Sequence, residues 1–258
     1  MNFNSLKIAI STYSILPVQQ IDWTEENLSS TVNYIPIIGV FSGLLLCGWH
    51  RLCLIYIPYS ILFSALATLI PVLISGGIHV DGYMDTWDAL GSYQSRARKL
   101  EIMKDSHSGA FAMISLIALL ILELGLWQVL ASSASRTILV VALGQILARS
   151  LSVMAAGILP RAKKEGMMHD LTSQISNRRL MVTMLIISLI VSALMVIASL
   201  IHGLAAISLA ALTLLYYCRV ARKQFGGVTG DTSGFAVEII YLSVIIAVAV
   251  SEIVLRQI

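Results

Sequence analysis

The sequence predicts an all-α, polytopic transmembrane helix bundle of about seven spans. Of its 258 residues, 57% are hydrophobic and only 12% are charged, whereas soluble domains hold about 25% charged residues. The mean hydropathy is +0.86, and apolar runs of about 20 residues, long enough to cross a bilayer, recur along the chain. We therefore interpret residues 1–258 as a single integral membrane domain embedded in a lipid bilayer.

Seven apolar segments account for these spans. The first residues predict an interfacial helix that ends near Pro17 and not a signal peptide, because no small-residue cleavage site follows. Tight turns are expected at His50-Arg51 and at His202-Gly203, where polar residues interrupt long apolar runs. The expected spans are residues 32–49, 54–75, 109–131, 137–159, 181–201, 203–218 and 235–255.

Basic residues are distributed unevenly between the connecting loops. The loops after the second, fourth and sixth spans hold twelve Lys and Arg residues, whereas the loops after the first, third and fifth spans hold two. Cytoplasmic loops of membrane proteins carry such an excess. We therefore expect a cytoplasmic N-terminus and an external C-terminus. The basic residues are too dispersed for a nucleic-acid-binding face, so no nucleic acid partner is expected.

One polar stretch, residues 76–109, lies between two apolar runs and contains five acidic residues. Asp81, Asp85 and Asp88 are spaced i, i+4, i+7, which places three carboxylates on one stripe of a helix. Such like charges repel unless a cation joins them. Carboxylate oxygens suit Mg2+, which leaves its other positions to water and phosphate. The stretch predicts either a magnesium site or a solvated acidic helix face.

The residues around the aspartates permit two interpretations as well. His79 and the glycines at 76, 77 and 82 provide a backbone that approaches a ligand closely. The cations that follow either neutralise phosphate oxygens or only anchor the chain at the membrane surface; they include Arg96, Arg98, Lys99 and Lys104. Asp105 and Ser106 stand where the third span begins, and they are candidate ligands or candidate helix caps.

A glycine-rich segment, residues 226–234, precedes the last expected span. It holds four glycines together with hydroxyl side chains and one carboxylate. Backbone N–H groups in such loops bind phosphate, although glycine-rich loops also simply turn the chain. The candidate phosphate contacts are Gly227, Thr229 and Gly230, and Asp231 is a candidate metal ligand. The loop charges place this segment on the same side of the membrane as the aspartates.

Four segments resemble one known family, and they occur in its order along the chain: YIPIIGVFSGLL, GGIHVDGYMDTWDAL, LEIMKDSHSGAF and GGVTGDTSGF. This is the cobalamin synthase family, also called adenosylcobinamide-GDP ribazoletransferase. The resemblance places the family's motifs on His79, Asp81, Gly82, Asp85, Thr86 and Asp88, on Glu101–Ser106 and on Gly226–Thr232. One departure is Lys163, which stands where an arginine is common and lacks the bidentate fork that arginine offers to phosphate.

The resemblance implies an Mg2+-dependent enzyme of the bacterial inner membrane, with its active site facing the cytoplasm. Its substrates would be adenosylcobinamide-GDP and α-ribazole or α-ribazole 5′-phosphate, and its products adenosylcobalamin or its 5′-phosphate and GMP. For this reaction we expect Mg2+ on the pyrophosphate, held by Asp81, Asp85, Asp88 and Asp231. The catalytic candidates are Asp81, Asp85, His79 and Lys104; the residue types do not decide whether a carboxylate or His79 accepts the hydroxyl proton. The further substrate-binding candidates are Arg98, Lys99, Asp105, Ser106, Lys163, Gly227, Thr229 and Gly230.

Two other classes of protein also cluster acidic residues at a membrane edge. A CDP-alcohol phosphatidyltransferase-like enzyme would show D-x-x-D-G-x-x-A-R, but Ala and Arg do not follow Gly82 at that spacing. A cation transporter or channel would use ionisable residues at mid-span, for which the candidates are Glu123, Arg149, Glu238 and Glu252. A homo-oligomer is a further expectation that no sequence pattern supports.

Overall fold

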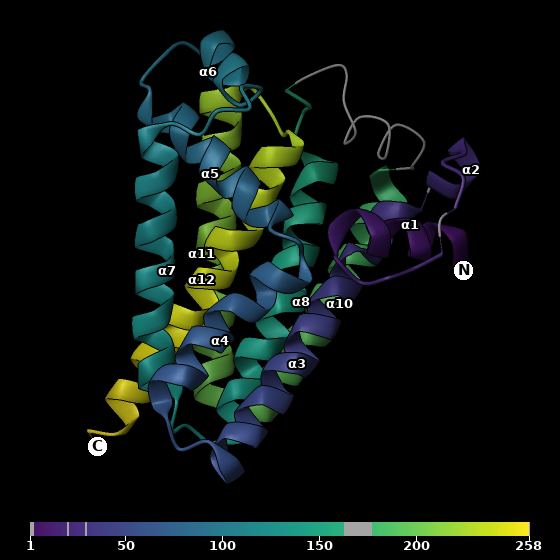
Figure 1. The fold of residues 1–258 in the computed structure, drawn as a ribbon. Coiled ribbons are helices and arrows are strands. Elements are labelled where there is room, and N and C mark those ends of the chain that lie inside the picture. Colours follow the sequence, from purple (N-terminus) through teal and green to yellow (C-terminus); the bar gives the residue numbers. More distant parts are fainter. Residues whose placement is uncertain (1–2, 20, 29, 163–176, 258) are drawn as a thin grey trace.

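The computed structural model describes residues 3–19, 21–28, 30–162 and 177–257, and helices make up most of these segments (Figure 1). In chain order the elements are α1 (Phe3–Tyr13), α2 (Glu25–Leu28), the 3₁₀ helix η1 (Thr31–Tyr34), α3 (Ile35–Tyr56), α4 (Ser60–Ile74), α5 (Ile78–Gly91), α6 (Arg96–Ile102), α7 (Ala110–Leu130), α8 (Ser135–Ile158), α10 (Asn177–Ala198), α11 (Leu200–Val220), the π-helical turn η2 (Ala221–Phe225) and α12 (Gly230–Leu255). The predicted all-α bundle is confirmed.

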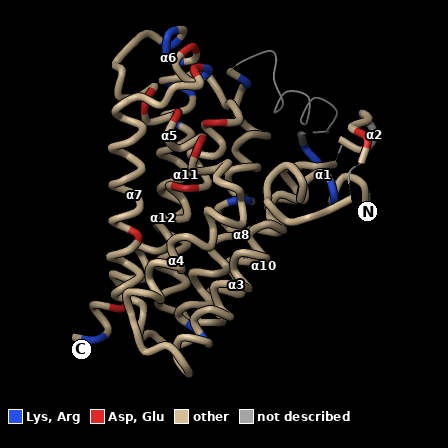
Figure 2. Tube along the Cα trace, viewed as in Figure 1, with Lys and Arg blue, Asp and Glu red and all other residues tan. Residues whose placement is uncertain are grey.

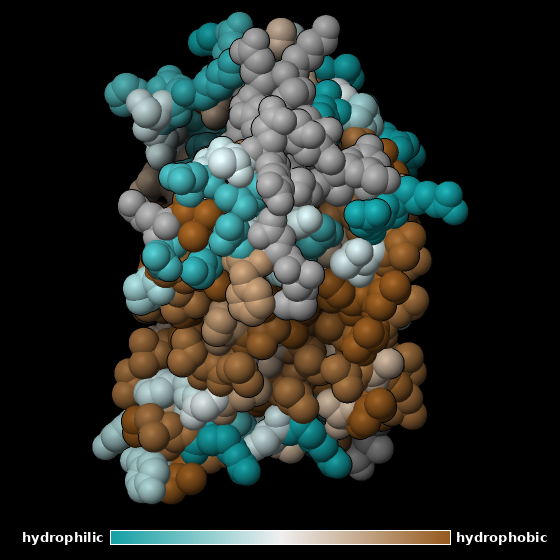
Figure 3. Space-filling model, turned by 90° about the vertical axis from the view of Figure 1, so that its right-hand side faces the viewer, coloured by the Kyte–Doolittle hydropathy of each residue, from teal (hydrophilic) through white to brown (hydrophobic). Residues whose placement is uncertain are grey.

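Six of the described helices are long and apolar enough to cross a membrane, or seven spans result if the bent pair α4–α5 counts as one. The prediction of about seven spans is therefore confirmed. Figure 3 shows a broad apolar band between hydrophilic ends on the face that carries α1 and α3. Such a band is the surface that lipid tails cover. The cytoplasmic position of the N-terminus stays a prediction from loop charge.

The predicted turn at His50 and Arg51 is wrong. Helix α3 continues through both residues to Tyr56, and the chain turns only around Pro58. His50 does not end the helix because its side chain is buried in the bundle, where its ring lies 5.5 Å from the ring of Phe63. A polar residue inside an apolar run therefore does not end the helix when its side chain is buried against another helix.

The predicted break at His202-Gly203 is also displaced. Helix α10 ends at Ala198, and α11 begins at Leu200, so the break falls at Ser199. His202 lies in the first turn of α11 and is buried. The backbone of Met195 passes so close to Gly203 that a Cβ there would lie 2.6 Å from the Met195 carbonyl oxygen. The glycine thus permits a sharp reversal and does not itself form the break.

Helices α8 and α12 form the centre of the bundle. α8 packs along α3 and α10, and α12 packs along α11, α5 and α7. Small residues allow close helix contacts in a membrane: a Cβ at Gly39 or Gly43 of α3 would lie within 3 Å of the α8 backbone. The remaining helices are arranged around this pair (Figure 1).

The chain bends by 92° between α4 and α5. Gly76 and Gly77 have φ angles of +62° and +80°, a left-handed conformation that glycine adopts without steric cost. These glycines therefore turn the chain, a different role from the ligand approach expected from the sequence. The bend leaves α5 and its aspartates at the end of the bundle that also holds α6 (Figure 1).

Candidate active site at one end of the bundle

Helix α5 carries the predicted aspartate stripe. Its residues Tyr83 and Trp87 pack against Phe235 of α12, with ring centroids 5.8 and 5.9 Å apart. This aromatic contact fixes the buried face of α5, so the aspartates lie along its border: Asp81 is exposed, while Asp85 and Asp88 are half-buried. Figure 2 shows acidic residues gathered in this half of the bundle, with basic residues above them on α6.

Two glycines bring the first turns of α5 and α12 into direct contact. A Cβ at Gly82 would lie 2.5 Å from the carbonyl oxygen of Asp231, and a Cβ at Gly234 would lie 3.1 Å from the carbonyl oxygen of His79. Gly82 therefore serves helix packing. The prediction that the aspartates of α5 and Asp231 share one end of the molecule is confirmed.

The glycine-rich segment builds the start of α12. Gly226 and Gly227 have φ angles of +80° and +158°, so they make a turn that other residues rarely adopt. Thr229 then caps the helix: its Oγ1 accepts a hydrogen bond from the Thr232 backbone N–H at 3.1 Å, and the Thr229 N–H donates to Thr232 Oγ1 at 2.8 Å. Gly230, the first residue of α12, is exposed and has open space where a side chain would be.

The segment after α8 joins this turn. The Val228 N–H donates to the Pro160 carbonyl at 2.8 Å, and the Ala162 N–H donates to the Val228 carbonyl at 3.1 Å. A side chain at Gly227 would collide with the Pro160 carbonyl oxygen. Three segments far apart in sequence thus meet at one end, as the loop charges predicted. Lys163 lies outside the described residues.

Helix α6 is fastened to η2 by two basic side chains. Arg96 Nη2 donates to the carbonyl oxygens of Arg222 and Lys223 at 3.3 and 3.2 Å, groups that a helix end leaves without helical partners. Lys99 Nζ donates to Gln224 Oε1 at 2.6 Å, and Lys99 is only 6% exposed. The Lys99 ammonium therefore holds the fold together, a role that sequence reasoning missed because Gln224 lies 125 residues away.

A cavity of about 330 Å³ opens between α5, α6 and the loop before α7. It is lined by Asp88, Ser92, Arg98, Glu101, Ile102, Asp105, His107, Ser108 and Gly109. Arg98 forms an exposed ion pair with Glu101 at 2.8 Å. The structure thus brings Asp88, Arg98 and Asp105 together, while Lys104 and Ser106 are exposed in the same loop. Lys104 is not among the residues that line the cavity.

Within this loop, His107 partners Asp105. The His107 backbone N–H donates to Asp105 Oδ1 at 3.0 Å, and His107 Nδ1 lies 2.8 Å from the same oxygen. These hydrogen bonds, the backbone one first, hold the pKa of the Asp105 carboxyl below its usual value. No sequence pattern singled out His107, and the structure places it in the lining of the cavity.

Helix α7 begins too late in the chain for Asp105 or Ser106 to cap it, because its N-cap lies three residues after Ser106. Gly109 is its N-cap residue and makes no side-chain cap, so a capping role for Asp105 or Ser106 is wrong. Instead, Asp88 Oδ1 accepts a hydrogen bond from the Ala112 backbone N–H at 3.4 Å. A side chain at Gly109 would collide with the Asp88 carboxylate. Asp88 therefore caps α7 from a neighbouring helix, which the spacing of the aspartates alone could not indicate.

The arrangement suits a cation held partly by substrate. Among the described residues, no three His, Cys, Asp or Glu side chains form a group that could hold a metal ion alone. Asp81 and Asp85 on α5 and Asp231 on α12 nevertheless come from contacting helix turns. Because Mg2+ commonly takes one or two carboxylates and completes its shell with water and phosphate, this donor set fits the ion.

His79 and the mid-span ionisable residues lie in the interior. His79 is 5% exposed, its ring lies 6.4 Å from that of Tyr13, and its Nε2 has no hydrogen-bond partner within the described part of the chain. Arg149 Nη1 donates a hydrogen bond to the side-chain amide oxygen of Gln145 at 2.6 Å. Glu123 and Glu238 are likewise buried, whereas Glu252 lies near the opposite end of the bundle.

Fold and site together define a multi-pass membrane protein with one polar, carboxylate-bearing end suited to phosphoryl transfer. The model of the cobalamin-5-phosphate synthase family matches residues 5–249, and the chain belongs to this family. It is therefore a transferase of cobalamin synthesis, which sets aside the phosphatidyltransferase-like and transporter alternatives. The family resemblance stated from the sequence is confirmed.

Relatives named adenosylcobinamide-GDP ribazoletransferase match over nearly the full length. One from Lachnoclostridium phytofermentans is 35% identical over 96% of this chain and 94% of its own. One from Brevibacillus brevis is 32% identical over 91% and 93%, and one from Geobacillus thermodenitrificans is 32% identical over 92% and 91%. No solved structure matches the chain.

Proposed function

We propose that the protein is an Mg2+-dependent adenosylcobinamide-GDP ribazoletransferase of a bacterial inner membrane, with its active site facing the cytoplasm. It would transfer the adenosylcobinamide-phosphate group from adenosylcobinamide-GDP to α-ribazole or α-ribazole 5′-phosphate. The products would be adenosylcobalamin or its 5′-phosphate and GMP. The observation that carries this proposal is the contact of the aspartate-bearing α5 with the start of α12 at Gly82 and Asp231.

Asp81, Asp85 and Asp231 are the residues that would hold the magnesium ion. When bound, the ion supplies positive charge to the pyrophosphate oxygens, where negative charge grows in phosphoryl transfer. We assign Asp88 to a different task, because its carboxylate already accepts the N–H of Ala112. Asp88 thereby fixes the start of α7, and with it the cavity wall, relative to α5.

The chain's own cations and helix start orient the substrate. The N-terminus of α12 at the exposed Gly230 offers backbone N–H groups and a positive helix end to a phosphate, and Thr229 fixes that end by capping it. Arg98 lines the cavity between α5, α6 and the loop before α7, and its side chain is 62% exposed, so its guanidinium is available to phosphate oxygens. Lys104, Asp105 and Ser106 form the exposed rim. Lys99 holds α6 in place through Gln224.

In the reaction, a free ribose hydroxyl of the ribazole attacks the phosphorus nearer cobinamide, and the bond from that phosphorus to the oxygen of GMP breaks. The attacking hydroxyl is not the 5′ one, because α-ribazole 5′-phosphate carries its phosphate there and the product keeps it. GMP leaves with the bonding electron pair, and the hydroxyl proton passes to a base. We assign this base to an α5 carboxylate, because Asp81 is exposed whereas His79 is 5% exposed. His79 then acts as a packing residue between α5 and α1.

The test measures GMP release from membranes supplied with adenosylcobinamide-GDP and α-ribazole, with Mg2+ or with a chelator. Asp81→Asn, Asp85→Asn and Asp231→Asn should each lower turnover by about 10²-fold to 10³-fold, with membrane insertion unchanged. Asp22→Asn, in the exposed segment before α2, is the control and should keep full turnover. Full activity of Asp81→Asn or Asp85→Asn, or turnover that survives chelation, would contradict the metal assignment.

A further inference from the structure

A groove of about 680 Å³ lies between α3 and α10, away from the candidate active site. Both helices pack along α8, and Ile146 of α8 lines the space between them. The backbones of α3 and α8 meet at Gly39, where a Cβ would lie 2.6 Å from the Gln145 carbonyl oxygen. This close contact holds α3 against α8 and leaves the groove beside it.

The lining of the groove changes from polar to apolar along the helices. At one end it is lined by Asn33 of η1 and by Arg179 and Thr183 in the first two turns of α10. At the other end it is lined by Ile37 and Val40 of α3 and by Ile187 of α10. Arg179 and Ile187 are eight residues apart, which is about 12 Å along a helix. The groove thus matches a ligand with an anionic head and an apolar tail.

The polar end lies where a bilayer has its headgroups. Arg179 immediately precedes the apolar run of α10 that begins at Leu180, and basic residues at such positions reside at the membrane surface. Val40 is 36% exposed on the outside of the bundle, so the apolar end opens toward lipid tails. Part of this face belongs to the apolar band that Figure 3 shows.

We propose that the α3–α10 groove binds an anionic phospholipid, with the lipid phosphate against Arg179 and one acyl chain along Ile37, Val40 and Ile187. Arginine binds phosphate through a bidentate pair of hydrogen bonds, and basic pockets between transmembrane helices are recognition sites for acidic lipids. A general attraction to an anionic leaflet would involve the exposed neighbour Arg178 equally, but only Arg179 of the pair lines the groove.

The test compares the two arginines in the full-length protein. Each variant is reconstituted in nanodiscs of phosphatidylcholine with phosphatidylglycerol as the minor component, released into mild detergent, and its bound lipids are counted by native mass spectrometry. Arg179→Gln should lower the ratio of bound phosphatidylglycerol to phosphatidylcholine about fivefold, and Arg178→Gln should leave it unchanged. Arg179→Lys should keep most of the preference, because lysine still binds phosphate as a point charge.

A second variant examines the apolar end. Val40→Trp should fill the groove and lower retention of both lipids. If the Val40→Trp variant does not fold, the comparison of Arg178→Gln with Arg179→Gln tests the proposal without it. An equal loss in Arg178→Gln and Arg179→Gln, or an unchanged ratio in Arg179→Gln, would overturn the proposal. The lipid count needs no substrate, so it is independent of the proposed transferase reaction.

Discussion

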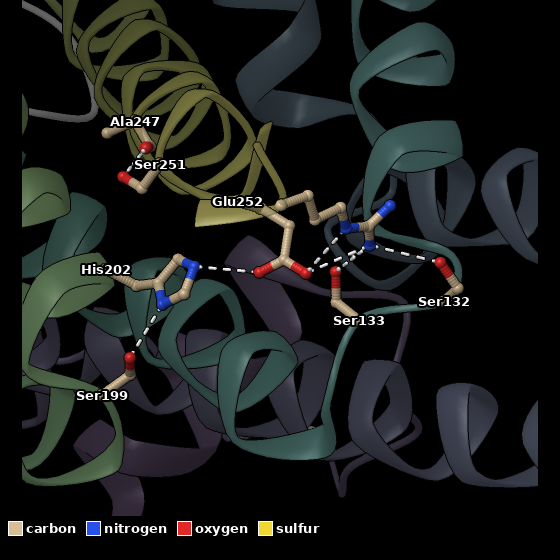
Figure 4. A network of polar contacts seen from close by, with 8 residues as sticks. Ser132, Ser133, Ser199, His202, Ala247, Ser251 and Glu252 are labelled. Carbon is tan, nitrogen blue, oxygen red and sulfur yellow. Dashed lines mark hydrogen bonds and ion pairs between the residues drawn. The ribbon is translucent and has the colours of Figure 1, made fainter. Parts of the chain in front are cut away.

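The two ends of the bundle use polar residues in different ways. At the end opposite the candidate active site, His202 and Arg256 each bond to Glu252, and each also bonds to a serine of a neighbouring turn. Figure 4 shows His202 between Ser199 and Glu252. At the active-site end, Arg98, Glu101, Asp105 and His107 line a cavity. Both arrangements pair their charges, but the His202–Glu252 pair is 6% and 14% exposed, whereas the Arg98–Glu101 pair is 62% and 63% exposed and therefore open to a ligand.

The far-end network joins three separate segments. Ser199 Oγ and His202 Nδ1 lie 2.7 Å apart, and His202 Nε2 lies 3.0 Å from Glu252 Oε2. The Arg256 guanidinium donates to the other Glu252 oxygen at 3.1 Å and to Ser132 and Ser133 at 3.2 Å each. The turns after α7 and α10 are thereby tied to the end of α12. The sequence placed His202 only at an expected turn, and the structure shows that it links these segments.

This contrast shows that a charged residue in the bundle is not by itself a sign of a ligand site. Charged residues inside an apolar bundle are costly unless they are paired, and the far end pairs them within the chain. At the active-site end, Lys99 donates a hydrogen bond to Gln224 and the Asp88 carboxylate accepts one from the Ala112 N–H, so both side chains hold helices together. The exposed charges that remain around the cavity are the ones available to substrate.

The largest effect is expected where the two helices of the active-site end touch. Gly82→Ala would place a Cβ 2.5 Å from the Asp231 carbonyl oxygen, so α5 and α12 must separate. We expect a loss of about 1–3 kcal/mol in the free energy of unfolding and near-complete loss of GMP release. Gly125→Ala on α7 is the matched control, because open space surrounds that position. Wild-type turnover in Gly82→Ala would refute the importance of this contact.

At the far end, the expected effect falls on stability alone. Glu252→Ala removes the partner of both His202 and Arg256, and leaving the buried His202 Nε2 without this partner costs about 1–3 kcal/mol. GMP release per folded molecule should not change. Chemical unfolding in detergent measures the first quantity, with Ser251→Ala beside it as a control for helix α12. A specific loss of turnover at unchanged stability would show that the two ends are not separate in function.

A smaller effect is expected for the cap that links the cavity to α7. Asp88→Ala removes the acceptor of the Ala112 N–H, and loss of such a cap costs about 0.5–2 kcal/mol. Asp88→Asn keeps an oxygen acceptor and should retain most of that stability. Comparing the unfolding of the two variants separates capping from charge. Equal destabilisation by both would indicate that the negative charge itself is what Asp88 contributes.

The smallest effect concerns the pH dependence of the cavity loop. The hydrogen bonds to His107 lower the pKa of the Asp105 carboxyl in the folded protein. Their stabilisation of the loop is therefore fully present above the ordinary Asp pKa of about 4. It is lost as the pH falls through the lower pKa of the folded state. His107→Ala keeps the backbone donor and removes the ring contact, so Asp105 should titrate at higher pH. Infrared titration of the carboxyl band measures this shift. Ser106→Ala should leave the titration unchanged.

Much of the site could be predicted because its residues are close in sequence. The i, i+4, i+7 spacing placed three aspartates on one helix, and α5 confirms that helix. The excess of basic residues in alternate loops placed the loop at 160–179 and the glycine-rich segment 226–234 on the same side of the membrane as the aspartates. The Val228–Pro160 hydrogen bond confirms that the described parts of these two segments meet. Asp81, Asp85 and Asp231 as metal ligands stay a prediction.

Other features could not be predicted because they depend on long-range contacts. The turn expected at His50 is absent because that ring is buried against Phe63. No sequence pattern indicates a role for Gly109, yet its lack of a side chain makes room for the Asp88 carboxylate. Each of these roles is set by a partner in another helix, and neither residue's neighbours in the sequence carry that information.

The sequence by itself determined the membrane-spanning bundle, the aspartate helix and the family, because hydropathy, helical spacing and short motifs are local properties. Only the tertiary structure decided which polar groups are used in assembly and which remain for a ligand. That distinction depends on which backbones approach closely enough at Gly82, Gly109 and Gly227 to bring donors and acceptors together. These close approaches are set by packing in three dimensions and not by a pattern along the chain.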